Sequence, residues 1–405
     1  MAIPKLTVEM ISAQRILRNN DMAEDKSSGI AKVPLELYIH IPFCVKKCDY
    51  CDFLSAPADQ RTQDAYFDAL LEEIHSRDRS AEYEIISVFI GGGTPSVPAA
   101  GQIARVMQAL REHFSFAGDA EITIEANPGT LTAEKLEIYK KSGINRLSLG
   151  LQSTDDRELK LLGRIHTYED FLDSFRLARE AGFQNINADL ISAIPEQTEE
   201  SWIRNLRRVA ELSPEHISAY SLIVEEGTPF AERELNLPDE DTEYQMYEDA
   251  HIVLSEYGYE QYEISNYAKP GFACRHNLGY WKRTPYLGLG LGAASFFEGY
   301  RFSNTRVLTE YLSDSACPDK IHRDVEPVSR QSAMEEFLFL GFRMTEGVSE
   351  QEFERQFGIP LQQKYGGFLK KYESSGHLER AGDFWRLTRR GIHVSNWILA
   401  DVLEE

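Results

Sequence analysis

Three cysteines stand close together near the start of the chain. The segment CVKKCDYC places Cys44, Cys48 and Cys51 in a CxxxCxxC array. A structural zinc site normally uses four ligands in pairs, and no second CxxC or HxxxH segment completes one here. A thioredoxin-like redox pair needs CxxC alone. Three thiolates at this spacing favour an iron–sulfur cube in which one iron keeps an open coordination position. An incomplete zinc site stays open as the alternative.

The cysteines follow a predicted strand, and strands of this kind recur along the chain. Short apolar runs predict six strands, at residues 35–41, 85–90, 121–126, 146–152, 185–191 and 216–224. Amphipathic stretches between them predict helices. Repeated strand–helix units imply an α/β fold with a parallel sheet, either a partial (β/α)6 TIM-like barrel or an open doubly wound sheet. In both folds the ligand site lies beyond the C-terminal ends of the strands.

Polar or backbone-exposing residues stand where that rule expects chemistry. GGGTPS, at 91–96, follows the second strand, and Asn127-Pro128-Gly129 follows the third. Gln152 ends the fourth strand, and Asp189 lies near the end of the fifth. Packing alone does not explain such residues at successive strand ends. We therefore expect one site at this edge of the sheet.

The array, the aromatic Tyr50 between its last two cysteines, and GGGTP after the second strand resemble the radical S-adenosylmethionine enzymes. More narrowly, the chain resembles the coproporphyrinogen dehydrogenase-like branch, and best its heme chaperone members. The resemblance covers nearly everything from about residue 35 to the C-terminus. It implies a 4Fe–4S cluster on the three cysteines, with the amino and carboxylate groups of S-adenosylmethionine on the fourth iron. An electron from the cluster would then cleave the cofactor to a 5′-deoxyadenosyl radical.

The resemblance also implies which other residues contact the cofactor. They are Tyr38, Gly92, Gly93, Thr94, Glu125, Gln152, Arg164 and Asp189. Glycine lets a ligand approach the backbone, carboxylates suit ribose hydroxyls and ammonium, and arginine suits a carboxylate. The plain alternatives are a tight turn for the glycines, an ordinary strand aromatic for Tyr38, and surface, capping or loop roles for the rest.

One stretch departs from the family pattern. After Asp189 the chain reads ISAIPEQT, where relatives usually show a tyrosine and glycines at Ser192, Ala193 and Glu196. We expect a bulkier backbone neighbourhood there to change the fit of the cofactor.

Phe53 separates two functions that the resemblance leaves open. In the oxygen-independent coproporphyrinogen dehydrogenases a fourth cysteine stands at this position, and activity is tied to it. Phe53 therefore disfavours that reaction and favours a heme chaperone that delivers heme to respiratory or other heme proteins. The alternative is a radical enzyme acting on a porphyrin, by decarboxylating or methylating it. No residue is assigned as catalytic, and cleavage of the cofactor in the natural cycle stays open.

A second motif supports the chaperone. CRHNLGYW contains HNxxYW, which resembles the signature of that branch and gives His276, Asn277, Tyr280 and Trp281 as candidate heme contacts. A neutral imidazole can ligate heme iron, and aromatic faces suit the porphyrin. The alternative is a hydrogen-bonded histidine in the core.

Composition limits the binding partners and the cellular location that the chain can have. The chain has 405 residues and a net charge of −22, which argues against wholesale binding to nucleic acid or anionic lipid. Five cysteines, three of them in one array, argue against a disulfide framework and for a reducing compartment, so we expect a cytoplasmic protein. No apolar run is long enough to span a bilayer. A transient visit to the membrane and a homodimer stay open.

The expected parts are an N-terminal arm at 1–33, a partial barrel at 34–265, a connecting segment at 266–330 and a winged-helix-like domain at 331–405. The last part holds twelve acidic and nine basic residues. The basic footprint of a DNA-binding winged helix is therefore missing.

Overall fold

The computed structural model describes residues 32–77 and 82–404. The six predicted strands are all present and lie side by side in chain order. They are β1 (Val33–Ile41), β2 (Tyr83–Gly92), β3 (Phe116–Ala126), β4 (Arg146–Gln152), β5 (Ile186–Ser192) and β6 (His216–Ser221). β2 to β6 pair in parallel. The predicted arm at 1–33 lies outside the described residues except for its last two positions.

β6 ends earlier than the apolar run at 216–224 predicts. Its last residue, Ser221, pairs with Ser192, where β5 also ends. Beyond that point no neighbouring strand remains, and Ile223 is 68% exposed. The residues that follow Ser221 therefore leave the sheet and continue as a loop beyond the C-terminal ends of β5 and β6.

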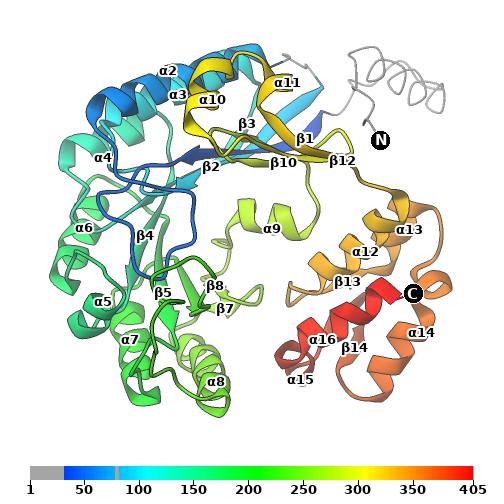
Figure 1. Cartoon of the computed structure of the whole chain (residues 1–405). Helices are drawn as coiled ribbons and strands as arrows, with labels where there is room; N and C mark the ends of the chain where they lie inside the picture. The colour runs from blue at the N-terminus through cyan, green and yellow to red at the C-terminus, as the bar shows by residue number, and fades with distance from the viewer. Residues whose placement is uncertain (1–31, 78–81, 405) are drawn as a thin grey trace. The chain divides into compact units, whose positions relative to one another are not determined.

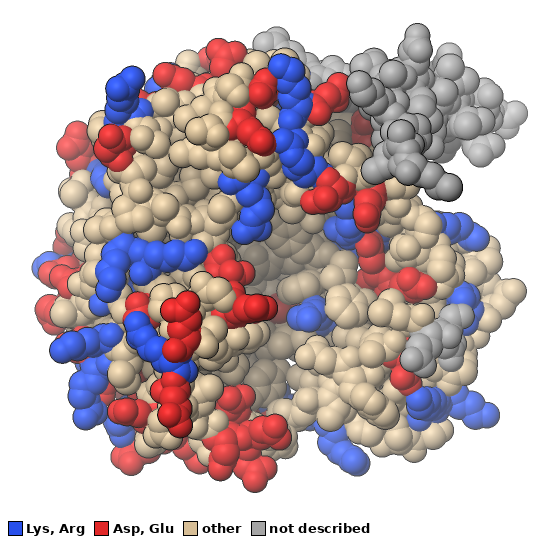
Figure 2. Space-filling model, in the orientation of Figure 1, with Lys and Arg blue, Asp and Glu red and all other residues tan. Residues whose placement is uncertain are grey.

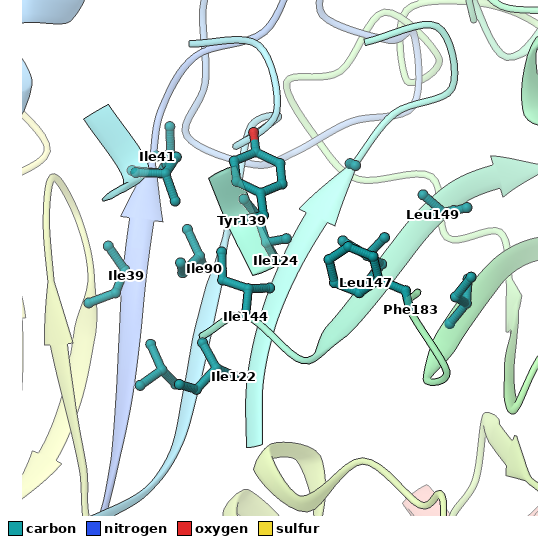
Figure 3. Close-up of a cluster of buried hydrophobic side chains, with 14 of the residues drawn as sticks. Ile39, Ile41, Ile90, Ile122, Ile124, Tyr139, Ile144, Leu147, Leu149 and Phe183 are labelled. Atoms are coloured by element: carbon teal, nitrogen blue, oxygen red, sulfur yellow. The ribbon is translucent and has the colours of Figure 1, made fainter. Parts of the chain in front are cut away.

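Helices cover the outer face of this sheet (Figure 1). They are α2 (Gln60–Ser76), α3 (Ala100–His113), α4 (Ala133–Lys141), α6 (Tyr168–Glu180), α7 (Glu199–Glu211) and α8 (Glu240–Glu256), with the short α5 (Asp156–Leu161) before α6. Side-chain caps fix several helix starts, as where Thr167 and Thr198 each form a capping box. Isoleucines of β1, β2 and β3 pack against these helices in the core (Figure 3).

Further strands extend the sheet at both of its edges, beside β1 and beside β6. β9 (Tyr286–Leu289) pairs in parallel with β1, and β10 (Ala294–Phe297), β11 (Tyr300–Asn304) and β12 (His322–Pro327) follow it antiparallel. At the other end, β8 (Asn266–Ala268) and β7 (Glu260–Gln261) extend β6. The segment 266–330 therefore does more than connect. α10 (Leu308–Asp314) and α11 (Pro318–Ile321) complete it. No hydrogen bonds close the described strands into a ring.

The C-terminal part has a core of its own. Its elements are α12 (Arg330–Gly341), β13 (Val348–Ser349), α13 (Glu350–Phe357), α14 (Leu361–Ser374), β14 (Leu378–Ala381), β15 (Phe384–Leu387), α15 (Arg389–His393) and α16 (Ser395–Ala400), with a last 3₁₀ turn at Asp401–Glu404. This is the element order of a winged helix. The exact domain boundaries at 265 and 330 stay predictions.

Ion pairs join this part to the rest of the described chain. Glu336 of α12 accepts from Arg283 and Arg301, and Glu248 of α8 accepts from Arg389 and His393. On the face shown in Figure 2, acidic and basic side chains are interspersed, and acidic ones gather where α8 lies. No helix among residues 32–77 and 82–404 is long and apolar enough to cross a membrane.

A short helix, α9 (Arg275–Trp281), lies on the inner side of the curved sheet (Figure 1). It packs closely against β1: a Cβ built on Gly279 would come within 2.1 Å of Glu36 Oε1. Burial raises the pKa of Glu36 to about 9, although its hydrogen bond from Ser87 lowers it. The carboxyl group is therefore neutral at pH 7, which reduces the cost of burying it.

We call this packing of α9 against β1, with Gly279 beside Glu36, the seat of α9. Gly279→Ala tests it. The added methyl group has no room beside Glu36, so we expect the free energy of unfolding to fall by about 1–3 kcal/mol in chemical denaturation. Gly101→Ala on α3 is the control, because nothing lies within 4 Å of its Cβ. Equal stability of Gly279→Ala and the wild type would show that the helix does not need this close approach.

Candidate functional site

The three cysteines lie on the loop that follows β1. Cys44 is buried, Cys48 and Cys51 are half-buried, and all three are free. Two backbone hydrogen bonds shape the loop: Cys44 N–H donates to Ala56 O at 3.3 Å, and Cys51 N–H donates to Cys48 O at 3.2 Å. Burial raises the pKa of Cys44 and of Cys51. The thiolate forms of both residues are therefore disfavoured when no cation is bound. Bound iron, which is positively charged, would stabilise them.

Arg164 ties the cysteine loop to the ends of two strands. Its Nη2 donates to Gly150 O at 2.6 Å and to Asn127 Oδ1 at 2.8 Å, and its Nη1 lies 3.6 Å from Cys48 Sγ. Its buried Nε has no partner in the described part of the chain. A cavity opens beside it, lined by Val45, Lys46, Cys48, Thr94, Asn127 and Arg164 among others. The guanidinium thus has a donor left for a ligand.

Two half-buried carboxyl groups, Glu125 and Asp189, lie near the ends of β3 and β5. Glu125 Oε2 accepts from Gly92 N–H at 3.1 Å. Burial, helped by the charge of Asp189, raises the pKa of Glu125 to about 8. Burial also raises the pKa of Asp189, which accepts hydrogen bonds from Asn187 and Ser148. Both carboxyl groups are desolvated, and the charge of Asp189 acts on Glu125. The pair therefore favours a ligand that carries positive charge.

The other predicted cofactor residues fall around these two centres. Thr94 Oγ1 accepts from Asn127 Nδ2 at 2.8 Å, which joins it to Arg164. The Tyr38 hydroxyl lies 2.9 Å from His40 Nδ1, and burial with the charge of Glu125 raises its pKa. Gln152 ends β4 with a positive φ of 73°. Such strain in a non-glycine residue is typical of functional sites.

The glycines have a reason beyond ligand approach. A Cβ on Gly93 would lie 2.6 Å from Phe43 O, and one on Gly92, whose φ is +113°, would lie 2.7 Å from the His40 ring. These positions therefore require glycine for packing against the end of β1 and the residues that follow it. Their role toward a cofactor stays a prediction.

The stretch after Asp189 keeps the backbone shape of glycines without having them. Ala193 has φ of 58° and Glu196 has φ of 65°, and both lie in the left-handed region that favours glycine. This is where relatives were expected to carry glycine. The chain thus retains the local turn at a cost in backbone strain.

The sequence did not assign contacts to several residues of the site. Asn127 bridges Thr94 and Arg164, the charge of Arg164 interacts with Tyr50, and Ser148 and Asn187 hold Asp189. Asn127 and Tyr50 stood out in the sequence by their positions after a strand and between two cysteines, whereas Ser148 and Asn187 carried no signal. Among the described residues, no three or more His, Cys, Asp or Glu side chains converge as ligands of a single metal ion would.

Of the HNxxYW residues, His276 is buried, and Asn277, Tyr280 and Trp281 are half-buried. His276 is 1% exposed, its Nδ1 lies 2.8 Å from Ser87 Oγ, and its Nε2 lies 3.0 Å from Tyr280 Oη. Burial, and then the charge of Arg146, lower the pKa of His276 to about 3. The ring is therefore neutral, and both of its nitrogens already have partners.

The remaining motif residues reach three further neighbours. Tyr280 meets the Tyr286 ring edge-on at 4.7 Å, Arg343 lies over the Trp281 ring at 5.3 Å, and the Asn277 backbone hydrogen-bonds the Cys274 thiol. The motif thus connects the sheet with the C-terminal part. Phe53, by contrast, is 64% exposed beside the cysteines.

Comparison with known proteins identifies the family. Residues 38–209 match the Radical SAM superfamily, and residues 328–394 match the HemN C-terminal domain. The chain is 38% identical to the heme chaperone HemW of Haemophilus influenzae, over 92% of this chain and 98% of that protein. It is 37% identical to HemW of Escherichia coli, over 92% and 99%. The chain belongs to the HemW family of radical SAM proteins.

A solved structure supports the same fold. Coproporphyrinogen III oxidase (HemN) from Escherichia coli, described as a radical SAM enzyme, matches with a TM-score of 0.80 and 26% identity, over 92% of this chain and 90% of that one. The family implies a 4Fe–4S cluster and S-adenosylmethionine. The residues present fit both groups: three free cysteines share one loop, Arg164 lines the cavity beside them and has a buried Nε without a partner, and two desolvated carboxyl groups lie near the ends of β3 and β5.

The pKa of Glu125 predicts how cofactor binding depends on pH. Below pH 8 the group is protonated in the free protein, and above it the carboxylate attracts the sulfonium cation. We expect the dissociation constant of S-adenosylmethionine to fall as pH rises from 6.5 to 8.5, by up to about tenfold per pH unit from this group. Equilibrium dialysis on anaerobically reconstituted protein measures it.

Glu125→Gln isolates the contribution of that residue. The amino group of the cofactor titrates equally in all proteins, so the difference between the wild-type and variant slopes reports Glu125. Glu134→Gln, on the surface of α4, should keep the wild-type slope. An unchanged slope in Glu125→Gln would contradict this assignment.

Proposed function

We propose that this protein is a heme chaperone, which binds heme together with a 4Fe–4S cluster and S-adenosylmethionine and delivers heme to other heme proteins. The observation that carries the proposal is the match to HemW heme chaperones over nearly the whole of both chains. Phe53, where the dehydrogenases carry a fourth cysteine, adds to it.

Cys44, Cys48 and Cys51 would hold the cluster, and Arg164 would orient the carboxylate end of the cofactor. Glu125 and Asp189 would face its positive and hydroxyl groups, with Tyr38, Gly92, Gly93, Thr94 and Gln152 around them. When bound, the cluster and cofactor together supply one-electron chemistry. The chain's own contribution is to bind and orient them.

The heme contacts would come from His276, Asn277, Tyr280 and Trp281. His276 can ligate iron only after it gives up its contact with Ser87 or with Tyr280. Because the ring is also buried, heme binding through this residue requires α9 to leave its seat. The motif would then be hidden until heme is captured.

The partners that fit this function are heme and heme-accepting proteins. We further propose that the protein works in the cytoplasm, that its acceptors include membrane-associated respiratory enzymes reached by transient contact, and that it can pair as a homodimer. The similarity to coproporphyrinogen III oxidase favours a porphyrin as cargo or substrate. A porphyrin-modifying radical enzyme is accordingly the alternative that the test must separate.

One anaerobic experiment separates these functions. Protein reconstituted with iron and sulfide is titrated with hemin, followed by its Soret band, and is separately incubated with coproporphyrinogen, S-adenosylmethionine and a reductant. We expect stoichiometric hemin binding and no protoporphyrinogen. Formation of protoporphyrinogen would overturn the chaperone proposal.

Two variants test the heme ligand in opposite directions. His276→Ala should weaken hemin binding at least tenfold and shift the Soret band, because the axial ligand is lost. Tyr280→Phe removes the hydroxyl that competes for Nε2, so it should bind hemin at least as tightly as the wild type. Equal affinity of His276→Ala and the wild type would exclude His276 as the ligand.

A further inference from the structure

Helix α9 and the cofactor carboxylate Asp189 are joined by a continuous chain of hydrogen bonds through the interior of the fold. The Cys274 amide, at the start of α9, lies 3.3 Å from Tyr262 Oη, which lies 2.8 Å from His216 Nε2. His216 Nδ1 lies 2.6 Å from Asn187 Oδ1. Asn187 Nδ2 then donates to Asp189 Oδ1 at 2.7 Å.

The chemistry of the groups fixes the direction of every bond in this chain. The Asp189 carboxylate can only accept, so the Asn187 amide must turn its NH₂ toward it and its oxygen toward His216. That oxygen in turn requires the proton on His216 Nδ1. Burial lowers the pKa of His216 well below its usual range, so the ring is neutral and Nε2 accepts from Tyr262. The Tyr262 oxygen then accepts from the Cys274 amide.

A second set of contacts spans the same two ends. Glu121 Oε1 accepts from the Arg275 and His276 amides at 3.0 and 3.3 Å, and so caps α9. Arg146 is 1% exposed, and its charge interacts with Cys274, Glu121, Tyr262 and Asp189. One buried cation is therefore shared between the start of α9 and the cofactor carboxylate.

We propose that Tyr262, His216 and Asn187 are positioning residues that set Asp189 for S-adenosylmethionine only while α9 is seated. The inference rests on the proposed function, in which heme needs α9 unseated. When α9 leaves, Tyr262 loses the Cys274 amide, and the polarised chain that orients Asn187 against Asp189 loses its first donor. Heme and S-adenosylmethionine therefore weaken each other's binding, although they occupy different residues.

The experiment measures this coupling in the full-length reconstituted protein. The dissociation constant of S-adenosylmethionine is determined by equilibrium dialysis with and without saturating hemin, and that of hemin with and without S-adenosylmethionine. In the wild type each ligand should raise the other's dissociation constant by the same factor, at least about fivefold. Equal constants with and without the second ligand would overturn the proposal.

Tyr262→Phe keeps the ring and removes the hydroxyl that links Cys274 to His216. We expect it to bind S-adenosylmethionine at least threefold more weakly without hemin, and its coupling factor to fall below two. A merely structural role would weaken binding without abolishing the coupling. Tyr259→Phe is the matched control, because that buried hydroxyl donates to Pro214 O at 2.6 Å, outside the chain of bonds, and should keep wild-type coupling.

Asn187→Asp is a second variant for the case in which Tyr262→Phe folds poorly. It has nearly the same shape but replaces the donor to Asp189 by an acceptor, so S-adenosylmethionine binding and coupling should both be lost. Wild-type coupling in either variant would overturn the proposal. Absence of hemin binding in every protein would contradict the proposed function instead. The dissociation constants of S-adenosylmethionine for Tyr262→Phe and Tyr259→Phe, measured without hemin, would still show whether the chain of hydrogen bonds positions Asp189.

Discussion

The inner face of the parallel sheet is polar, and buried polar groups must be paired. β1 turns Glu36, Tyr38 and His40 inward while Leu37 and Ile39 pack against the helices. β3 does the same with Glu121, Thr123 and Glu125. A hydrocarbon core cannot fill such an interior. Helix α9 fills much of it and supplies the missing partners, and the arrangement of both candidate sites depends on this.

Near the C-terminal ends of the strands, the same polarity serves ligands. Loops that follow different strands converge there because the strands are parallel. Arg164 draws the cysteine loop, β3 and β4 together through Cys48, Asn127 and Gly150. Burial raises the pKa values of Glu125 and Asp189, so both carboxyl groups would be sensitive to the charge of a ligand. Toward the other end of the strands, the polar groups hold α9.

The HNxxYW motif belongs to the part of the interior where the polar groups hold α9. Its histidine meets β2, its tyrosine meets β9 and its tryptophan meets the C-terminal part. A motif with these contacts holds three parts of the fold together before it meets any heme. In the proposed function, heme capture through His276 has to break these contacts. Heme binding would then change how α9 packs against the sheet.

Much of this fold was predictable because its periodicity is strong. Buried parallel strands such as RLSLGLQ are short apolar runs, and the match at 146–152 is complete. The strand-end rule pointed to Asp189 and the resemblance to Glu125, and the structure places both near the ends of parallel strands, while their role toward a cofactor stays a prediction. Shorter elements were missed, because four-residue strands such as β9 and β10 carry no periodic signal.

Other features needed coordinates for physical reasons. The inward position of α9 depends on how Gly279 fits Glu36, a contact between residues 243 positions apart. Asn187 and His216 lie in strands whose sequences predict only alternation, and their partners come from neighbouring strands. The sequence left two interpretations of His276 open, an iron ligand and a hydrogen-bonded core histidine. Only the structure shows that both of its ring nitrogens have partners.

Hydrogen exchange of the α9 amides measures directly whether heme moves this helix away from the sheet. Mass spectrometry on peptides that cover residues 275–281 would compare the reconstituted protein alone, with S-adenosylmethionine and with hemin. We expect slower exchange with S-adenosylmethionine, because it favours the packed position of α9, and faster exchange with hemin, because α9 leaves that position. Stoichiometric hemin binding that leaves the exchange of these amides unchanged would contradict this expectation.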